Sequence, residues 1–260
     1  MRSNCRQVHE KQNILHIIME VHHHPDVHHK NKHFKEYFLE FLMIFLAVTM
    51  GFFAESLREN INDSAKAKDY IRSFYEDMKT DTAKISAILD FDDDKMIGLG
   101  NIAKCYDTVL QSTQSCSCMF QIVKNTIFNM PFQITDRTLQ QLGNAGGFRL
   151  LQKEDADSIT RYLQDFNYIR DFQSTGYQQA QDEVRKTMSQ VINVKATLQL
   201  LSPEIKGELL FSHDKALLNE YFNEIIKYNG FTGAQRGMLK KFRDNQIKMI
   251  GFFKNKYHFE

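Results

Sequence analysis

The 260-residue chain has no tryptophan, only three prolines, 12 glycines and four cysteines. Because residues that interrupt helices are scarce, the composition favours long helices over many short strands joined by turns. Four cysteines are too few for a disulfide scaffold. The formal net charge is +1, so the chain has no overall field that would attract nucleic acid, and we expect no nucleic-acid partner.

One long apolar segment lies near the N-terminus. Residues 37–54, YFLEFLMIFLAVTMGFFA, contain Glu40 as their single charged residue. A helix of this length spans about 27 Å, near the thin end of a hydrocarbon core. The uncharged run 41–54 is short enough for a buried core helix or a signal peptide, but the small-x-small cleavage pattern is missing. We predict a transmembrane helix.

The predicted organisation has three parts. They are a His-rich tail at residues 1–35, a transmembrane helix at residues 36–55 and a helical soluble domain at residues 56–260. Lysines at 30, 32 and 35 precede the helix, whereas Arg58 follows it between Glu55 and Glu59. This bias favours a cytoplasmic N-terminus and, in a bacterial inner membrane, a periplasmic domain.

One face of the predicted membrane helix is suited to association. Glu40, Ala47, Gly51 and Ala54 share a stripe, and Ala47 and Gly51 form a small-xxx-small pair that lets two helices approach closely in lipid. Coincidence is the alternative, because Ala and Gly are common in such helices. Cross-linking between cysteines introduced at 47 and 51 tests this association; monomers in lipid would contradict it.

Histidine is concentrated in the tail. The cluster consists of His22, His23, His24, His28, His29 and His33. Imidazoles at this density bind Zn²⁺, Ni²⁺ or Cu²⁺, but a tail interrupted by Pro25 offers no fixed geometry. A solvated tail is the default interpretation, with metal binding or a pH-responsive charge beside lipid as alternatives. Translation beginning at Met19, just before the cluster, would make the upstream residues an over-extended gene prediction.

From Met19, the pattern MEVHHHPDVHHK…FKEYFLEFLMIFLAVTMGFFAESLRE resembles a group of uncharacterised single-pass membrane proteins of Bacteroidota. The segments at 70–82 and 137–163 are also similar to the helical domain of that group. The resemblance extends to about residue 170. It implies an inner-membrane location in a Gram-negative cell and no established activity.

After the anchor, apolar residues recur at helical spacing, which predicts an all-α fold in which long antiparallel helices form a bundle. The stripe begins Leu57, Ile61, Ile71, Phe74, Met78, Ile85, Ile88, Leu89. We expect helices at 96–110, 136–142, 153–201, 214–228 and 233–257, with breaks at 90–94 and at Gly230 and Gly233. One bundle and two subdomains meeting near 131–150 both fit this pattern.

The motifs that could carry chemistry are weak. The GNAGG segment at 143–147 lacks the Lys-Ser/Thr of a P-loop and fits a turn between helices. The acidic run at 90–94 has no EF-hand spacing, which favours a solvated run over a cation site. In an oxidising compartment, Cys105 could pair with Cys116 or Cys118 and leave one free thiol.

Histidine, the limiting residue for a catalytic triad or an acid/base pair, is scarce in the predicted domain. Outside the tail the histidines are His213 and His258, both in polar or terminal segments. We therefore expect no enzyme activity and no cofactor. The expected function is a membrane-anchored helical interaction or scaffold protein, whose partners are the lipid bilayer and another protein or a second copy. A periplasmic helical-bundle sensor and a metal-binding protein that uses the His tail are the alternatives.

Overall fold

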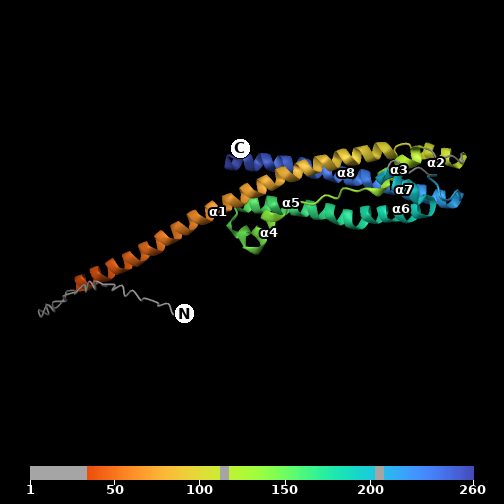
Figure 1. Cartoon of the computed structure of the whole chain (residues 1–260). Helices are drawn as coiled ribbons and strands as arrows, with labels where there is room; N and C mark the ends of the chain where they lie inside the picture. Colours follow the sequence, from red (N-terminus) through yellow and green to blue (C-terminus); the bar gives the residue numbers. More distant parts are fainter. Residues whose placement is uncertain (1–33, 112–116, 203–207) are drawn as a thin grey trace, which may run out of the picture. The chain divides into compact units, whose positions relative to one another are not determined.

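The structure, a computed structural model, describes residues 34–111, 117–202 and 208–260 (Figure 1). Within these ranges the regular elements are helices, and the one extended pairing is an isolated bridge between Ile192 and Leu210. The predicted all-α fold class is therefore confirmed. The chain divides into two units, Met1–Leu57 and Arg58–Glu260.

The first unit contains the beginning of helix α1 (Phe34–Leu99). An 18-residue window of this helix has a mean hydropathy of 2.0, and none of it is buried. By length and composition this helix could span a membrane. It does not end at residue 55, because its helical hydrogen bonding continues into the second unit as far as Leu99.

The second unit contains the rest of α1 and the helices that follow it in the chain. In chain order these are α2 (Ile102–Gln111), α3 (Ser117–Ile127), α4 (Arg137–Asn144), the 3-10 helix η1 (Gly147–Leu150), α5 (Lys153–Phe172), the π-helix η2 (Gln173–Tyr177), α6 (Gln178–Val191), α7 (Val194–Leu201) and α8 (Lys215–Tyr257).

Helices α1 and α8 run in opposite directions. The ring of Phe74, early in the unit, lies 6.2 Å from that of Phe253 near the end of α8. Further along α1, the Nζ of Lys95 lies 2.8 Å from the hydroxyl of Tyr228, near the middle of α8. Residue numbers rise along α1 as they fall along α8, so this pair agrees with the predicted antiparallel arrangement.

The pairing of α1 with α5, η2 and α6 is different from the prediction. Phe74 packs on Tyr162 of α5 with ring centroids 5.1 Å apart, and Lys95 contacts Tyr177 at the end of η2. Residue numbers rise in the same direction along α1 and along the continuous path of α5 and η2. These helices therefore run parallel to each other. The expectation of antiparallel helices throughout was wrong for this pair, because the chain returns without a helix of comparable length.

The return is made by an extended segment, residues 128–136, which Figure 1 shows running between α3 and α4. Phe132 in its middle packs against Phe166 of α5 and Phe242 of α8, at ring centroid distances of 5.9 and 5.8 Å. At its end, the backbone N–H of Thr135 donates to both carboxylate oxygens of Asp81, at 2.9 and 3.0 Å. The segment is therefore part of the interior rather than a loop over the surface.

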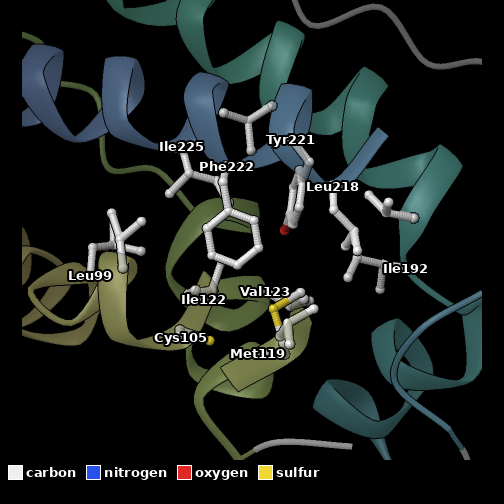
Figure 2. Packing of buried hydrophobic residues seen from close by; sticks show 14 of the residues in the cluster. Leu99, Cys105, Met119, Ile122, Val123, Ile192, Leu218, Tyr221, Phe222 and Ile225 are labelled. Atoms are coloured by element: carbon white, nitrogen blue, oxygen red, sulfur yellow. The ribbon is translucent and has the colours of Figure 1, made fainter. Parts of the chain in front are cut away.

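Buried apolar side chains form two clusters in this unit. The first cluster surrounds Phe74, Tyr162 and Phe242, where α1, α5 and the second half of α8 meet. The second cluster joins α2 and α3 to α6 and the first half of α8. Figure 2 shows Phe222 of α8 directed toward Ile122 of α3 in that cluster.

Several expected helix ends are wrong. The acidic run at 90–94 does not break α1, which continues to Leu99. Gly230 and Gly233 do not divide the C-terminal region, because α8 is continuous over 43 residues after its N-cap Asp214. The carboxylate of Asp214 accepts from two backbone N–H groups, at 2.8 and 3.0 Å, and so satisfies the free donors of the first turn.

The helix expected over 153–201 is interrupted twice. A π-helical turn, η2, separates α5 from α6, and an extended pair of residues at 192–193 separates α6 from α7. The Asn193 side chain caps α7 by accepting from the N–H of Lys195 at 3.0 Å. Before α5, the predicted turn at 143–147 is confirmed, with Gly146 at φ 62°, a conformation that glycine adopts without steric cost.

Candidate functional site

The predicted association face lies on α1. Glu40, Ala47, Gly51 and Ala54 are all exposed in the first unit, and a Cβ added at Gly51 would meet nothing within 4 Å. The face stays a prediction. The six clustered histidines, 22–33, lie outside the described residues.

Charged and polar side chains of α1 and α8 contact two tyrosines of the second apolar cluster. Asp92 and Lys95 of α1 are 0% and 1% exposed. Both belong to the same buried stripe as Ile88 and Leu99, because residues three or four apart lie on one side of a helix. We define the charged layer as Asp92, Lys95, Tyr177, Tyr228 and Gln235.

Lys95 joins three helical elements. Its ammonium group donates to the hydroxyl of Tyr177 at 2.9 Å and to that of Tyr228 at 2.8 Å. The two hydroxyls lie 3.0 Å apart and share a further hydrogen bond. The same ammonium lies 4.8 Å from the ring centroid of Phe91, within cation–π range. Lysine is rarely buried unless its charge is satisfied in this way.

Asp92 is less completely satisfied. Its Oδ2 accepts a hydrogen bond from Nε2 of Gln235 on α8 at 3.1 Å, whereas its Oδ1 has no hydrogen-bond partner in the described part of the chain. Leaving a buried carboxylate oxygen unpaired costs free energy. The neighbouring Asp93 is partly exposed and pairs with Arg236 of α8, so α1 and α8 are joined on both sides of this carboxylate.

Burial dominates the electrostatics of the layer. It lowers the pKa of Lys95 to about 8, against a smaller opposing effect of the Asp92 charge and a small contribution from Arg185 in the same direction as burial. Burial likewise raises the pKa of Asp92 and raises that of Tyr177 to about 12. Burial thus disfavours the charge on each of these groups, so Lys95 loses its proton more readily than an exposed lysine, whereas Asp92 and Tyr177 lose theirs less readily than exposed side chains of the same type.

The layer lies against the π-helical turn. Tyr177 is the last residue of η2, and Gly176 precedes it. A Cβ on Gly176 would lie 2.7 Å from Cε1 of Phe231 on α8, so glycine allows this close approach of the two helices. Single π-turns inside α-helices occur frequently at functional sites. The combination of a buried amine and an irregular turn makes this region the candidate functional site.

Two other buried carboxylates have a structural role. Asp77 pairs with Arg137 at 3.0 Å and with the hydroxyl of Thr138. Asp81 accepts from the hydroxyl of Tyr162 at 2.8 Å as well as from the backbone of Thr135. Together they attach the end of the return segment and the start of α4 to α1.

A disulfide links Cys105 of α2 to Cys118 of α3, with their Cα atoms 5.8 Å apart. The structure therefore selects Cys118 from the two partners that the sequence allowed, whereas Cys116 lies outside the described residues. Cys105 is buried in the second cluster, below Phe222 in Figure 2. The bridge fastens the short helices α2 and α3 to each other.

The remaining sequence candidates are dispersed. The acidic run places two exposed carboxylates, Asp90 and Asp94, and the ion-paired Asp93 around the buried Asp92, and His213 and His258 are both exposed. Among the described residues, no group of three or more His, Cys, Asp or Glu side chains is placed to hold a metal ion.

Sequence analysis missed the charged layer, although one signal was present. Asp92 and Lys95 follow Ile85 and Ile88 at the spacing of the buried stripe, so two charged residues occupy apolar positions. This pattern indicates buried charge if the helix is taken to continue. The predicted helix break at the acidic run interrupts this stripe and so hides the buried charges.

Comparisons with known proteins do not assign the chain to a family. No family model, curated protein or solved structure matches the chain. The resemblance to the Bacteroidota group therefore stays a prediction, and the function is argued from the structure alone.

Proposed function

We propose that this chain is a single-pass protein of a bacterial inner membrane, whose helical domain faces the periplasm and acts as a non-catalytic interaction or scaffold domain. The observation that carries the proposal is the apolar helix of the first unit, none of whose most hydrophobic window is buried by protein. Apolar surface of this extent is stabilised only by a membrane or a partner. The lipid bilayer is the solvent that fits its length.

Two lysines in the centre of the apolar segment are expected to remove the chain from the membrane. Each lysine costs about 2.5–3.5 kcal/mol at the centre of a membrane helix, so Ile44→Lys combined with Val48→Lys prevents stable insertion. The measurement is the fraction of full-length chain that stays in the pellet after carbonate extraction. Asn60→Lys with Ser64→Lys, at exposed polar positions of α1, is the matched control and stays in the pellet. Wild-type protein in the supernatant would overturn the membrane location.

The periplasmic orientation is supported by the disulfide, because such bridges persist in oxidising compartments. In a background with Cys5 and Cys116 replaced by serine, Phe211→Cys is expected to react with a membrane-impermeant maleimide in intact spheroplasts, since this side chain is exposed. Lys32→Cys in the N-terminal tail is expected to react only after lysis. The opposite labelling pattern would reverse the topology.

A sensor module is the second candidate function. It is favoured by the charged layer, where α1, η2 and α8 are held together by a lysine whose pKa is lowered by burial to about 8. A change of protonation there alters contacts among all three helices. Limited proteolysis of the full chain at pH 7 and pH 9 tests this alternative, and identical cleavage patterns would count against it.

A further inference from the structure

A groove lies between α5 and α8 in the second unit, and the proposed function has not used it. It encloses about 420 Å³. Its floor is formed by Tyr162 of α5 and by Phe242, Met249 and Phe252 of α8. Tyr162 and Phe242 are buried, with ring centroids 5.2 Å apart, whereas Met249 and Phe252 are partly exposed.

The groove has the form of a helix-binding site. Its α5 wall is a single stripe that contains Glu154, Ser158, Arg161 and Asp165, at spacings of four, three and four residues. At 1.5 Å per residue this stripe is about 16 Å long, or three helical turns. Two helices packed side by side leave a straight trough between their ridges, which an additional helix fills with residues at i, i+3 or i+4, and i+7.

The rims favour acidic residues on the occupant. Both acids of the α5 wall already have partners, because Glu154 pairs with Lys256 at 3.3 Å and Asp165 accepts from Asn245 at 3.3 Å. Neither cation of the rims, Arg161 or Lys248, takes part in an ion pair within the described residues, although Arg161 donates to the Ser158 hydroxyl at 3.4 Å. Arg161 and Lys248 stand on opposite walls, one from α5 and one from α8, and both are exposed.

The groove also contains an unsatisfied polar group. Gln246 lines it and is only 1% exposed, yet neither its amide nitrogen nor its amide oxygen has a well-formed hydrogen bond, although the Tyr162 hydroxyl is close. Buried amides are normally paired, so this one marks an incomplete part of the domain. Methionine side chains repack easily, and a shift of Met249 would give a polar side chain of a partner access to the amide.

We propose that the α5–α8 groove binds an acidic amphipathic helix of a partner protein. The apolar stripe of that helix packs on Tyr162, Met249 and Phe252, and acidic residues beside the stripe pair with Arg161 and Lys248. This inference rests on the proposed interaction function and gives that function a binding surface and a partner chemistry.

Site-specific photocross-linking of the full-length chain in its own membrane tests the groove. A benzoylphenylalanine is placed at Asn245 or Asp165, which line the groove, and in separate chains at Lys186 or Lys227, whose side chains are exposed and do not line it. The proposal expects adducts from the groove positions alone, and mass spectrometry should map them to a segment of another protein with apolar residues at i, i+3 or i+4, and i+7 flanked by Asp or Glu.

Charge reversal supplies the second measurement. Arg161→Glu with Lys248→Glu is expected to reduce the adduct from Asn245 by about tenfold or more, because like charges then face the partner across the rim. Lys186→Glu with Lys227→Glu is the matched control and leaves this adduct unchanged. Circular dichroism confirms that each variant remains folded.

Four outcomes would contradict the proposal that the α5–α8 groove binds an acidic amphipathic helix. They are no adduct above the control positions, an adduct to a second copy of this chain, an adduct to lipid, and an adduct to a segment without the acidic amphipathic pattern. A chain that resists carbonate extraction and forms adducts only at Lys186 or Lys227 would retain the proposed interaction function and exclude this surface.

Discussion

Asp81→Ala is expected to lower the unfolding free energy of the second unit by about 4 kcal/mol, the largest effect that we predict for a single substitution. Asp81 is 0% exposed and accepts hydrogen bonds from the Thr135 backbone and hydroxyl, from Tyr162 and from Lys84. Its removal takes away the carboxylate that accepts from the buried Tyr162 hydroxyl and from the half-buried Thr135 N–H. It also releases the return segment from α1.

The measurement is thermal or urea unfolding of the full chain in detergent micelles, followed by circular dichroism. One kcal/mol shifts the midpoint of a domain of this size by roughly 2–4 °C, so a decrease of about 10 °C is expected. Asp90→Ala, which removes an exposed carboxylate from the same helix, is the control and should change stability by less than about 0.5 kcal/mol. A loss below 1 kcal/mol (~3 °C) for Asp81→Ala would show that this carboxylate does not hold the return segment.

The second large effect is a dependence of stability on pH that Lys95 alone produces. The folded-state pKa of Lys95 is about 8, below its ordinary value of 10.5, so between these values the unfolded chain binds more protons than the folded one. The burial penalty is therefore fully present below pH 8 and is relieved as the pH rises toward 10.5. Between pH 8 and pH 10 the unfolding free energy should increase by about 2 kcal/mol from this group.

Comparison with Lys95→Met isolates this contribution, because every other titrating group is shared by the two proteins. The difference in unfolding free energy between the wild-type chain and Lys95→Met is measured at intervals from pH 8 to pH 10. Measurements stop there because the raised pKa of Tyr177 begins to destabilise the fold above the ordinary tyrosine pKa of 10.0. A difference that is constant with pH would mean that Lys95 keeps an ordinary pKa.

The sequence predicted the fold class because periodicity depends on local geometry. Of the first apolar stripe, Ile71, Phe74, Met78, Ile85, Ile88 and Leu89 are buried as their spacing predicts. Leu57 and Ile61 continue the same spacing, yet each is 62% exposed. Periodicity identifies the apolar side of a helix, but it does not say where along that helix a neighbour begins.

The predicted helix breaks were wrong where residues that are distant in the sequence stabilise the helix. Asp92 is tolerated inside α1 because Gln235, 143 positions later, donates to it and because Lys95 lies on the same stripe. Gly230 and Gly233 remain helical because the surrounding residues of α8 pack on both apolar clusters, which outweighs a propensity cost of about 1 kcal/mol per glycine. Neither the hydrogen bond from Gln235 nor the packing of α8 on the two clusters can be inferred from the residues next to these positions.

The candidate site was harder to predict than the fold. Its hydrogen bonds join residues of α1, η2 and α8 that are 82 and 133 positions apart, for Lys95 with Tyr177 and Tyr228. The disulfide is an intermediate case, because the sequence limited Cys105 to two nearby partners and only the packing of α2 on α3 selected Cys118. The parallel course of α1 and α5 required the extended return segment, for which residues 128–136 carry no distinctive motif.

The long separation between α1 and its partners on α8 has a consequence for biosynthesis. Phe74 meets Phe253, and the Tyr75 hydroxyl donates to the backbone carbonyl of Glu260, 185 positions later. A ribosome that has completed α1 must still add α8 before this interior can close. The two apolar clusters therefore cannot be completed during elongation, and a truncation before α8 leaves both exposed to chaperones and proteases.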